Sequence, residues 1–251
     1  MILSLRNIYK SYDEGKMEVP VLFDISLDVE EGEYVAIMGP SGSGKSTLMN
    51  IIGCLDVATS GEYILNGENI EGKTDNEMSD IRNKTIGFVF QNFNLLPRET
   101  ALENVALPML YGGVSRSERL ERAEEALRKV GLEDRMNFLP TQLSGGQKQR
   151  VAIVRALMMH PEVLLFDEVT AALDPEMVRE VLDVILDLAR NNSTMLIVTH
   201  EMAFARAIAD RVLFLDGGHI IEDTDPGQFF DSPGTDRAKK FLQTFEYESV
   251  R

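Results

Sequence analysis

At residues 39–46 the chain reads Gly39-Pro40-Ser41-Gly42-Ser43-Gly44-Lys45-Ser46, and the fold is decided here. This stretch fits the pattern G-x-x-x-x-G-K-S/T, whose glycines let the backbone curl so that amide hydrogens point inward at phosphate oxygens. The apolar run YVAIM (34–38) precedes it, and the helical stretch TLMNIIG (47–53) follows. A strand, a glycine-rich loop and a helix in this order predict a phosphate-binding loop of the Walker A type.

The side chains of this loop predict an ATP site that also uses Mg²⁺. Lys45 is expected to reach the β- and γ-phosphates, and the Ser46 hydroxyl is expected to bind Mg²⁺, which prefers oxygen ligands. A chance glycine-rich turn is the alternative, and the flanking strand and helix argue against it. The expected ATP-binding residues are Gly39, Pro40, Ser41, Gly42, Ser43, Gly44, Lys45, Ser46 and Thr47.

Further apolar runs extend the predicted sheet outward from this loop. IGFVF (86–90), VLLF (163–166) and MLIV (195–198) are continuously apolar, as strands covered on both faces are. Between the last two runs, residues 177–190 repeat apolar positions at helical spacing. Strand, helix and strand in this order predict an α/β fold with a mostly parallel sheet.

The remaining segments predict an antiparallel layer and a helical insertion. Residues 2–10 and 21–29 alternate apolar and polar, as half-buried strands do. Residues 93–159 show helical patterns without a strong strand, so we expect a helical subdomain there. The whole chain, 1–251, is then one domain, with a core of residues 1–92 and 160–251. A strand-like run, HIIE (219–222), and a helix around 237–245 are expected near the end.

Composition limits the partners and the compartment. The chain has 251 residues, 44% of them hydrophobic, and a formal net charge of −16, which argues against a nucleic-acid partner. Cys54 is the only cysteine, and the start of the chain lacks the apolar segment of a signal peptide, so we expect a cytoplasmic protein. The sequence contains no apolar stretch of the roughly 20 residues that cross a bilayer. Any membrane role is therefore expected to depend on a partner.

The carboxylates of VLLFDE (163–168) predict the second half of the ATP site. They follow a buried strand, and ligands of open α/β sheets gather at the carboxyl ends of strands. Asp167 is expected to hold Mg²⁺ through water, and Glu168 to polarise the water that attacks the γ-phosphate. The alternative is a strand that simply ends in polar residues.

The pentapeptide Leu143-Ser144-Gly145-Gly146-Gln147 precedes a helical run at 148–159 and offers a second anion site at a helix N-terminus. A turn with an N-cap is the alternative interpretation. With this motif added, the chain resembles ABC-transporter nucleotide-binding subunits over nearly its whole length. The resemblance implies an ABC ATPase fold and a homodimer in which two chains face head to tail. Each ATP then lies between one chain's phosphate loop and the signature pentapeptide of the other chain.

The resemblance also implies roles for four single residues. Tyr12 matches the aromatic residue that stacks on adenine, and Gln91 matches the glutamine that reaches Mg²⁺ or the attacking water. Asp174 matches a contact across the dimer, although Leu-Asp-Pro is also a helix-start signal. His200 matches the histidine that touches the γ-phosphate. Ordinary structural roles at strand ends are the alternatives for Tyr12, Gln91 and His200.

The chain departs from the family pattern at two positions after Glu168. Where the family usually reads DEPTSALD, this chain reads DEVTAALD, with Val169 in place of proline and Ala171 in place of serine. Val169 is expected to loosen the turn, and Ala171 removes a hydroxyl near the dimer face. Asp167, Glu168 and Asp174 are retained, so hydrolysis is still expected.

The resemblance leaves the cargo open. The N-terminal half and the helical insertion resemble the lipoprotein-release and macrolide-export group, whereas the C-terminal half resembles ATPases of polar amino-acid importers. Both imply integral membrane permease subunits as partners and a place at the inner face of the cell membrane. A soluble ABC ATPase without transport is the alternative, and a nucleotide-binding module without hydrolysis is a third.

Overall fold

The computed structural model describes residues 1–15, 17–189 and 193–245 of the chain. The chain divides into two compact units. The first consists of Met1–Lys73 with Leu196–Arg251, and the second of Thr74–Met195. The phosphate loop therefore belongs to the first unit, and the signature pentapeptide belongs to the second.

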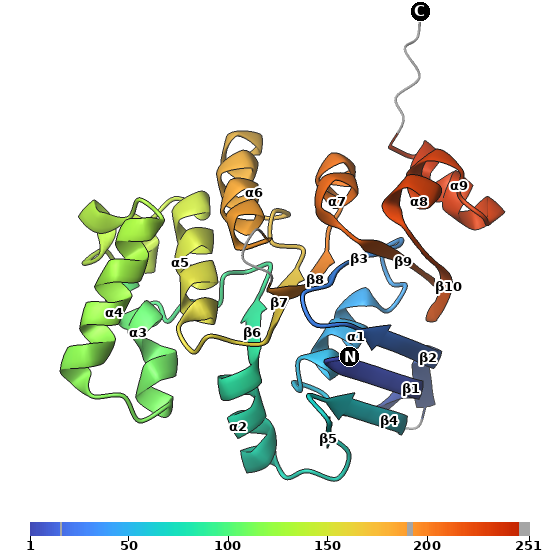
Figure 1. Ribbon diagram of the computed structural model, residues 1–251, viewed down its shortest axis with the longest axis horizontal. Coiled ribbons are helices and arrows are strands. Elements are labelled where there is room, and N and C mark those ends of the chain that lie inside the picture. Colours follow the sequence, from blue (N-terminus) through green and yellow to red (C-terminus); the bar gives the residue numbers. More distant parts are fainter. Residues whose placement is uncertain (16, 190–192, 246–251) are drawn as a thin grey trace, which may run out of the picture. The chain divides into compact units, whose positions relative to one another are not determined.

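The first unit contains a four-stranded antiparallel sheet (Figure 1). Its order is β2-β1-β4-β5, and the strands are β1 (Leu3–Glu14), β2 (Met17–Val29), β4 (Ser60–Leu65) and β5 (Glu68–Asn69). Leu3 and Leu5 of β1 are buried, as their alternation predicted, and Ile8 is also buried because the register of β1 shifts between Leu5 and Ile8. The predicted antiparallel layer is thus confirmed, but β1 and β2 extend beyond residues 2–10 and 21–29, because their pairing continues to Glu14 and Met17.

A second group of strands in this unit positions the phosphate loop. The hydrogen-bonded order is β10-β9-β3-β8, with β3 parallel to β9 and β10 antiparallel to β9. The strands are β3 (Tyr34–Met38), β8 (Thr194–Val198, of which residues from Leu196 belong here), β9 (Arg211–Asp216) and β10 (His219–Thr224). The continuous apolar run that predicted β3 is buried from Val35 to Met38.

The described part of the first unit also contains the helices α1 (Lys45–Ile52), α7 (Met202–Ile208), α8 (Pro226–Asp231) and α9 (Asp236–Gln243). Phe214 of β9, Phe229 of α8 and Phe241 of α9 meet in one apolar cluster. The ring centroids lie 5.7 Å apart for Phe214 and Phe229 and 4.9 Å apart for Phe214 and Phe241. The last two helices are therefore held against the sheet by aromatic packing.

The second unit joins a parallel strand pair to a group of helices. Its elements are α2 (Asp75–Thr85), β6 (Ile86–Val89), α3 (Ala101–Tyr111), α4 (Arg116–Lys129), α5 (Gly145–Leu157), β7 (Val163–Asp167) and α6 (Pro175–Ala189), with the short turns η1 (Glu133–Arg135) and η2 (Pro140–Gln142). Strands β6 and β7 run parallel, and Gly87 pairs with Leu164. The predicted α/β fold with parallel strands is confirmed.

The helices α3, α4 and α5 pack around a core of their own. Val105 and Met109 from α3, Leu127 from α4 and Val151 from α5 are buried together. Residues 93–159 contain helices and turns but no strand, as their helical patterns predicted. The sequence did not predict α2, and it gave no bounds for α3 within the helical segment; both helices begin with a capping box, at Thr74 and Thr100.

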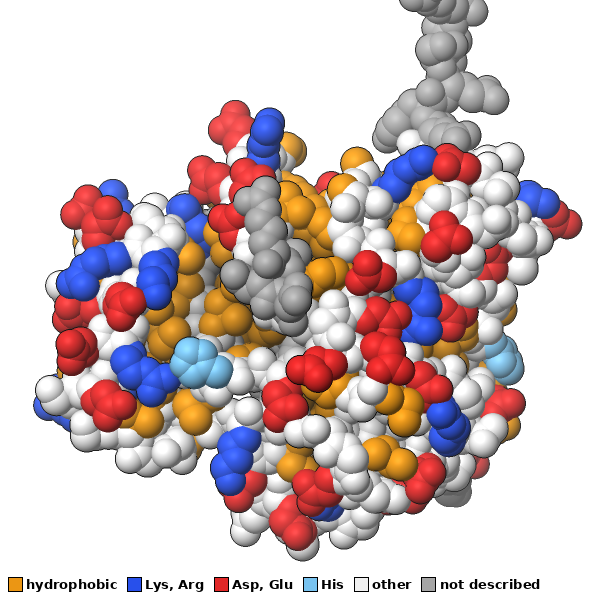
Figure 2. Space-filling model, viewed as in Figure 1, with side chains coloured by type: hydrophobic (Ala, Val, Ile, Leu, Met, Phe, Trp, Pro, Cys, Tyr) orange, Lys and Arg blue, Asp and Glu red, His pale blue; other side chains and the backbone are white. Residues whose placement is uncertain are grey.

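The surface of the chain carries many carboxylates. Acidic side chains are spread over the face drawn in Figure 2, in keeping with the formal net charge of −16. In the described part of the chain, every helix is too short or too polar to span a bilayer.

Asn104 of α3 fixes the segment that leads into this helix. The side chain is fully buried, and its Oδ1 accepts a hydrogen bond from the Leu96 amide at 2.7 Å. Its Nδ2 donates to the carbonyls of Leu96, Glu99 and Thr100 at 3.0–3.1 Å. One side chain thereby replaces the backbone partners that this irregular segment lacks.

We predict that Asn104→Ala lowers the free energy of unfolding by about 1–3 kcal/mol, because buried partners lose their hydrogen bonds. Urea denaturation followed by circular dichroism measures the change. Asn137→Ala, at an exposed asparagine of the same unit, is the control and should change stability by less than about 0.5 kcal/mol. Equal midpoints for the two variants would show that Asn104 does not hold the segment.

Candidate nucleotide-binding site

The phosphate loop joins β3 to α1 and is packed closely between β2 and β9. Gly44 stands at the N-cap of α1 with φ of 102°, and a Cβ added there would lie 2.6 Å from Leu22 Cδ2. A Cβ added at Gly39 would lie 2.1 Å from the Leu215 carbonyl oxygen. Only glycine fits both positions, so the spacing of the glycines follows from the packing of the loop.

Lys45 lies across this loop. Its side chain is buried, and Nζ donates to the carbonyls of Gly39 and Pro40 at 2.9 Å each. The first turn of α1 contains no acidic residue, so the ammonium and the helix N-terminus add their positive potentials. Ser43 Oγ is buried without a partner among the described residues. The loop therefore offers positive charge and polar groups that suit a polyphosphate.

A glycine pair between β9 and β10 anchors the loop from the other side. The Gly218 amide donates to the Ser43 carbonyl at 3.1 Å, and the Gly218 carbonyl accepts from the Phe23 amide at 2.9 Å. Gly218 thus connects the phosphate loop to β2. The motifs in the sequence do not mark Gly218, although a Gly-Gly dipeptide between two apolar runs is a turn signal.

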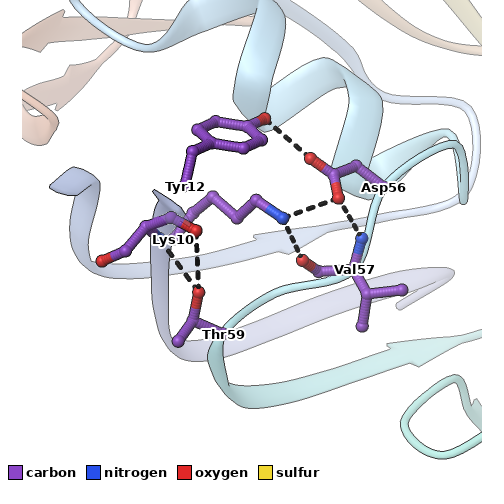
Figure 3. A network of polar contacts seen from close by, with 6 residues as sticks. Lys10, Tyr12, Asp56, Val57 and Thr59 are labelled. Carbon is purple, nitrogen blue, oxygen red and sulfur yellow. Dashed lines mark hydrogen bonds and ion pairs between the residues drawn. The ribbon is translucent and has the colours of Figure 1, made fainter. Parts of the chain in front are cut away.

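Tyr12 lies near the carboxyl end of β1, in the same unit as the phosphate loop. Its hydroxyl donates to Asp56 Oδ2 at 2.7 Å, and 37% of the residue stays exposed (Figure 3). Burial raises the pKa of the Tyr12 phenol, the bond to Asp56 raises it further, and a hydrogen bond with Thr47 acts in the opposite direction. Two residues predicted to bind ATP, Tyr12 and Thr47, are therefore neighbours.

His200 follows β8 and is exposed. Its ring lies 6.4 Å from that of Phe245, centroid to centroid, with an angle of 22° between the planes. The next amide, of Glu201, donates to Thr199 Oγ1 at 3.0 Å and so fixes the turn at the end of the strand. A γ-phosphate contact for His200 stays a prediction.

In the second unit, Asp167 ends β7 and Glu168 begins the turn that follows. Glu168 has φ of 47°, a left-handed conformation that is uncommon for residues other than glycine and that clusters at functional sites. The turn closes through a hydrogen bond from the Ala171 amide to the Glu168 carbonyl at 3.0 Å. Val169, which replaces the family's proline, is buried inside this closed turn.

Asp174 stands directly before α6. Its carbonyl accepts from the amides of Met177 at 2.8 Å and Val178 at 3.2 Å, so the prediction of a helix start at Leu-Asp-Pro is confirmed. A contact of Asp174 across a dimer stays a prediction.

The signature pentapeptide forms the start of α5. Ser144 is the N-cap and exchanges hydrogen bonds with Gln147, at 3.0 Å from the Ser144 amide to Oε1 and at 3.3 Å from the Gln147 amide to Oγ. A Cβ added at Gly146 would lie 3.2 Å from Met177 Cβ. The first turn of α5 therefore packs against the first turn of α6. Ser144 and Asp174, which precede these two helices, lie at neighbouring helix N-termini.

Gln91 is exposed just after β6, and α5 holds the adjoining segment. Gln149 Nε2 donates to the Phe90 carbonyl at 3.4 Å, and Arg155 donates to the carbonyls of Phe93 at 3.0 Å and Asn94 at 2.7 Å. One helix therefore begins with the signature pentapeptide and also fixes the backbone around Gln91. Gln149 and Arg155 could not be predicted from the sequence, because nothing distinguishes them there from other polar residues of an amphipathic helix.

The three residues predicted to bind a metal carry oxygen ligands, which Mg²⁺ prefers. Ser46 carries a hydroxyl, Gln91 an amide oxygen and Asp167 a carboxylate, which are hard ligands. Among the described residues, no three histidine, cysteine, aspartate or glutamate side chains gather as a metal site. Mg²⁺ does not need such a cage, because it keeps several waters and binds substrate phosphates.

The α/β units, the glycine-lined loop and Lys45 define a phosphate-loop nucleotide-binding protein, and comparisons with known proteins identify the family. A family model described as ABC transporter matches residues 22–171. The uncharacterized ABC transporter ATP-binding protein YvrO of Bacillus subtilis (strain 168) is 54% identical over 222 residues, covering 88% of this chain and 96% of that protein. The chain belongs to the ABC transporter family, and it is an ATP-binding subunit with ATPase activity.

Two further relatives match the two resemblances in the sequence. The arginine transport ATP-binding protein ArtM of Bacillus subtilis (strain 168) is 48% identical over 243 residues, covering 96% of this chain and 99% of that protein. The macrolide export ATP-binding/permease protein MacB of Mannheimia succiniciproducens is 48% identical over 223 residues, covering 89% of this chain but 34% of that protein. The predicted similarity to both groups is confirmed.

A solved structure confirms the ABC ATPase fold. It is described as the dimeric structure of a post-hydrolysis state of the ATP-binding cassette MJ0796 bound to ADP and Pi. That chain is 42% identical, with a TM-score of 0.83, and the match covers 90% of this chain and 99% of that one.

Proposed function

We propose that this chain hydrolyses MgATP as a head-to-tail homodimer and drives transport through a separate integral membrane permease. The observation that carries the proposal is the start of α5, where exposed Ser144 and the Gly145 amide form a helix N-terminus of the anion-binding kind. The Gly146 amide donates to Met177 Sδ at 3.3 Å and fixes the turn. The dimeric description of the 42% identical cassette supports two chains per assembly. Ser144 and Gly145 would bind the ATP held by the phosphate loop of the other chain.

The chemistry follows from the groups on each unit. The phosphate-loop amides and Lys45 bind the β- and γ-phosphates, and Ser46, Gln91 and Asp167 hold Mg²⁺. When bound, Mg²⁺ supplies positive charge that neutralises the phosphate oxygens. Gln91 orients the attacking water.

Hydrolysis itself is assigned to Glu168 and His200. Glu168 accepts a proton from the attacking water while the oxygen of that water forms a bond to the γ-phosphorus. The bond from the γ-phosphorus to the bridging oxygen breaks, and ADP and phosphate leave. His200 contacts the γ-phosphate during this step, and Asp174 contributes to the dimer contact.

We assign the parts of the chain to these roles by the boundaries that the sequence predicts. Residues 93–159 are the helical subdomain that contacts the permease, and residues 1–92 with 160–251 are the ATPase core. The strand-free pattern of 93–159, with its own apolar cluster, supports a separate subdomain. Contact with a permease places the chain at the inner face of the cell membrane.

Two cargo classes fit the relatives. Polar amino-acid import fits the likeness to ArtM, and lipoprotein or macrolide-type export or extraction fits the likeness to MacB. Copurification of the membrane chain and its identification by mass spectrometry distinguish the two classes. Recovery of the ATPase without any membrane protein would instead favour a soluble ABC ATPase.

We predict that Glu168→Gln gives a stable ATP-bound dimer with hydrolysis slowed roughly 10²–10⁴-fold. Glutamine keeps the size of the side chain but lacks the carboxylate that accepts the proton. Removal of one negative charge beside the triphosphate also reduces repulsion across the closed interface. Light scattering with and without MgATP, together with phosphate release, measures both effects.

Glu121→Gln makes the same charge change at an exposed position of α4 and should leave turnover and assembly as in the parent chain. If Glu168→Gln stays monomeric at saturating MgATP, or hydrolyses at the parental rate, Glu168 is not the base of a shared site.

We predict that Ser144→Ala abolishes most ATPase activity, whereas Ser115→Ala does not. Both serines are helix N-caps, of α5 and α4, and each hydroxyl accepts a hydrogen bond from the amide three residues on, at 3.3–3.4 Å. Either change should therefore lower stability by a similar amount, about 1 kcal/mol. Thermal unfolding and phosphate release are measured on both variants. Equal losses of activity would assign Ser144 to capping alone.

A further inference from the structure

A single carboxylate, that of Asp56, accepts hydrogen bonds from both the Tyr12 hydroxyl and the Lys10 ammonium. Asp56 Oδ2 accepts the Tyr12 hydroxyl at 2.7 Å, and Asp56 Oδ1 accepts Lys10 Nζ at 2.6 Å (Figure 3). Lys10 Nζ also donates to the Val57 carbonyl at 2.7 Å. Lys10 and Tyr12 both lie on β1, and the register of β1 shifts between Lys10 and Ser11, yet both side chains reach the same carboxylate.

Lys10 occupies one face of the Tyr12 ring. Its Nζ lies 4.6 Å from the ring centroid, within the range of a cation–π interaction. A planar ring has two faces, and the residue keeps 37% of its surface exposed. The ring is therefore supported from one side and retains accessible area for a flat ligand.

Asp56 is tied to the helix that begins at the phosphate loop. It follows α1, and the amides of Leu55 and Asp56 donate to the Asn50 carbonyl at 2.8 and 3.2 Å. The Val57 amide donates back to Asp56 Oδ1 at 2.7 Å. The carboxylate is thus fixed to α1, and through it the ring is placed relative to the phosphate loop.

The ion pair of Lys10 and Asp56 differs from another pair that also involves β1. Arg6 and Asp28 also pair, but 44% of each of those side chains is exposed, against 10% for Lys10 and 27% for Asp56. Water and salt therefore screen the Lys10 pair less. Burial alone would raise the pKa of Asp56, but hydrogen bonds from Lys10 and Tyr12 outweigh it, so the pKa lies below its usual range. Asp56 remains charged at neutral pH.

We propose that Lys10 and Asp56 are positioning residues for the nucleotide base: they fix the Tyr12 ring beside α1 so that its open face stacks on a purine. This inference rests on the proposed role of Tyr12 in binding ATP. The triphosphate is bound by the phosphate loop, so the spacing between ring and loop decides whether the base of the same nucleotide reaches the ring. Aromatic stacking tolerates different bases, but it requires the ring to stand at the right distance and orientation.

The test compares two ligands that share the phosphate chain. Calorimetry gives dissociation constants for MgATP and for magnesium tripolyphosphate, which lacks a base, with the parent chain and with Lys10→Met. Methionine keeps the apolar stem but removes the charge. We expect MgATP affinity to fall about three- to tenfold, in line with the loss of a partly buried cation–π contact and its ion pair, and tripolyphosphate affinity to stay unchanged.

Further variants separate positioning from a structural role. Asp56→Asn keeps an acceptor for the Tyr12 hydroxyl but loses the charge that holds Lys10, so it should act like Lys10→Met. Lys10→Arg should restore most of the affinity. Arg6→Met, which breaks the exposed pair on the same strand, should leave both ligands unaffected. In a Tyr12→Ala chain, Lys10→Met should cause no further loss of MgATP affinity.

Each contrary outcome removes a different part of the account. If Lys10→Met and Asp56→Asn lower the affinities for MgATP and tripolyphosphate equally, Lys10 and Asp56 only maintain the phosphate loop, and the positioning role is wrong. If Tyr12→Ala leaves the ratio of the two affinities unchanged, Tyr12 does not stack on the base, whatever Lys10 does. If the parent chain binds no MgATP, the proposed function fails as well.

Discussion

The close packing of the phosphate loop is the constraint on which the first unit depends. A Cβ at Gly39 would clash with the backbone of β9, Gly44 has a positive φ that favours glycine, and Lys45 donates to two loop carbonyls. The loop keeps this conformation only if β2 and β9, which belong to different sheets, stay in contact with it. The long hairpin of β1 and β2 and the turn at Gly218 meet this need, and the same hairpin carries Tyr12.

Helix α5 has a comparable role in the second unit. Its first turn is capped by Ser144, and its later residues Gln149 and Arg155 bind the backbone on both sides of Gln91. The core that α5 shares with α3 and α4 supports this arrangement. Two groups that we propose to contact ATP, the signature pentapeptide and Gln91, are thus positioned by one helix rather than by separate loops.

The sequence predicted those parts of the protein in which a short contiguous pattern fixes the backbone. The phosphate loop, the buried strands and the start of α5 are of this kind, since glycine spacing, apolar runs and caps act locally. The network of Lys10 and Asp56 is not, because these residues are separated by 46 positions and each is an ordinary charged residue. The extension of β1 to Glu14 was missed because KSYDEG does not alternate. The roles of the individual site residues stay predictions.

The central claim is that two copies of this chain complete each ATP site. The direct measurement is steady-state phosphate release at saturating MgATP over a wide range of chain concentration, with light scattering on the same samples. The account predicts that activity per chain is low in dilute solution and rises with concentration as dimers form. An activity per chain that stays constant while light scattering shows only monomers would contradict it.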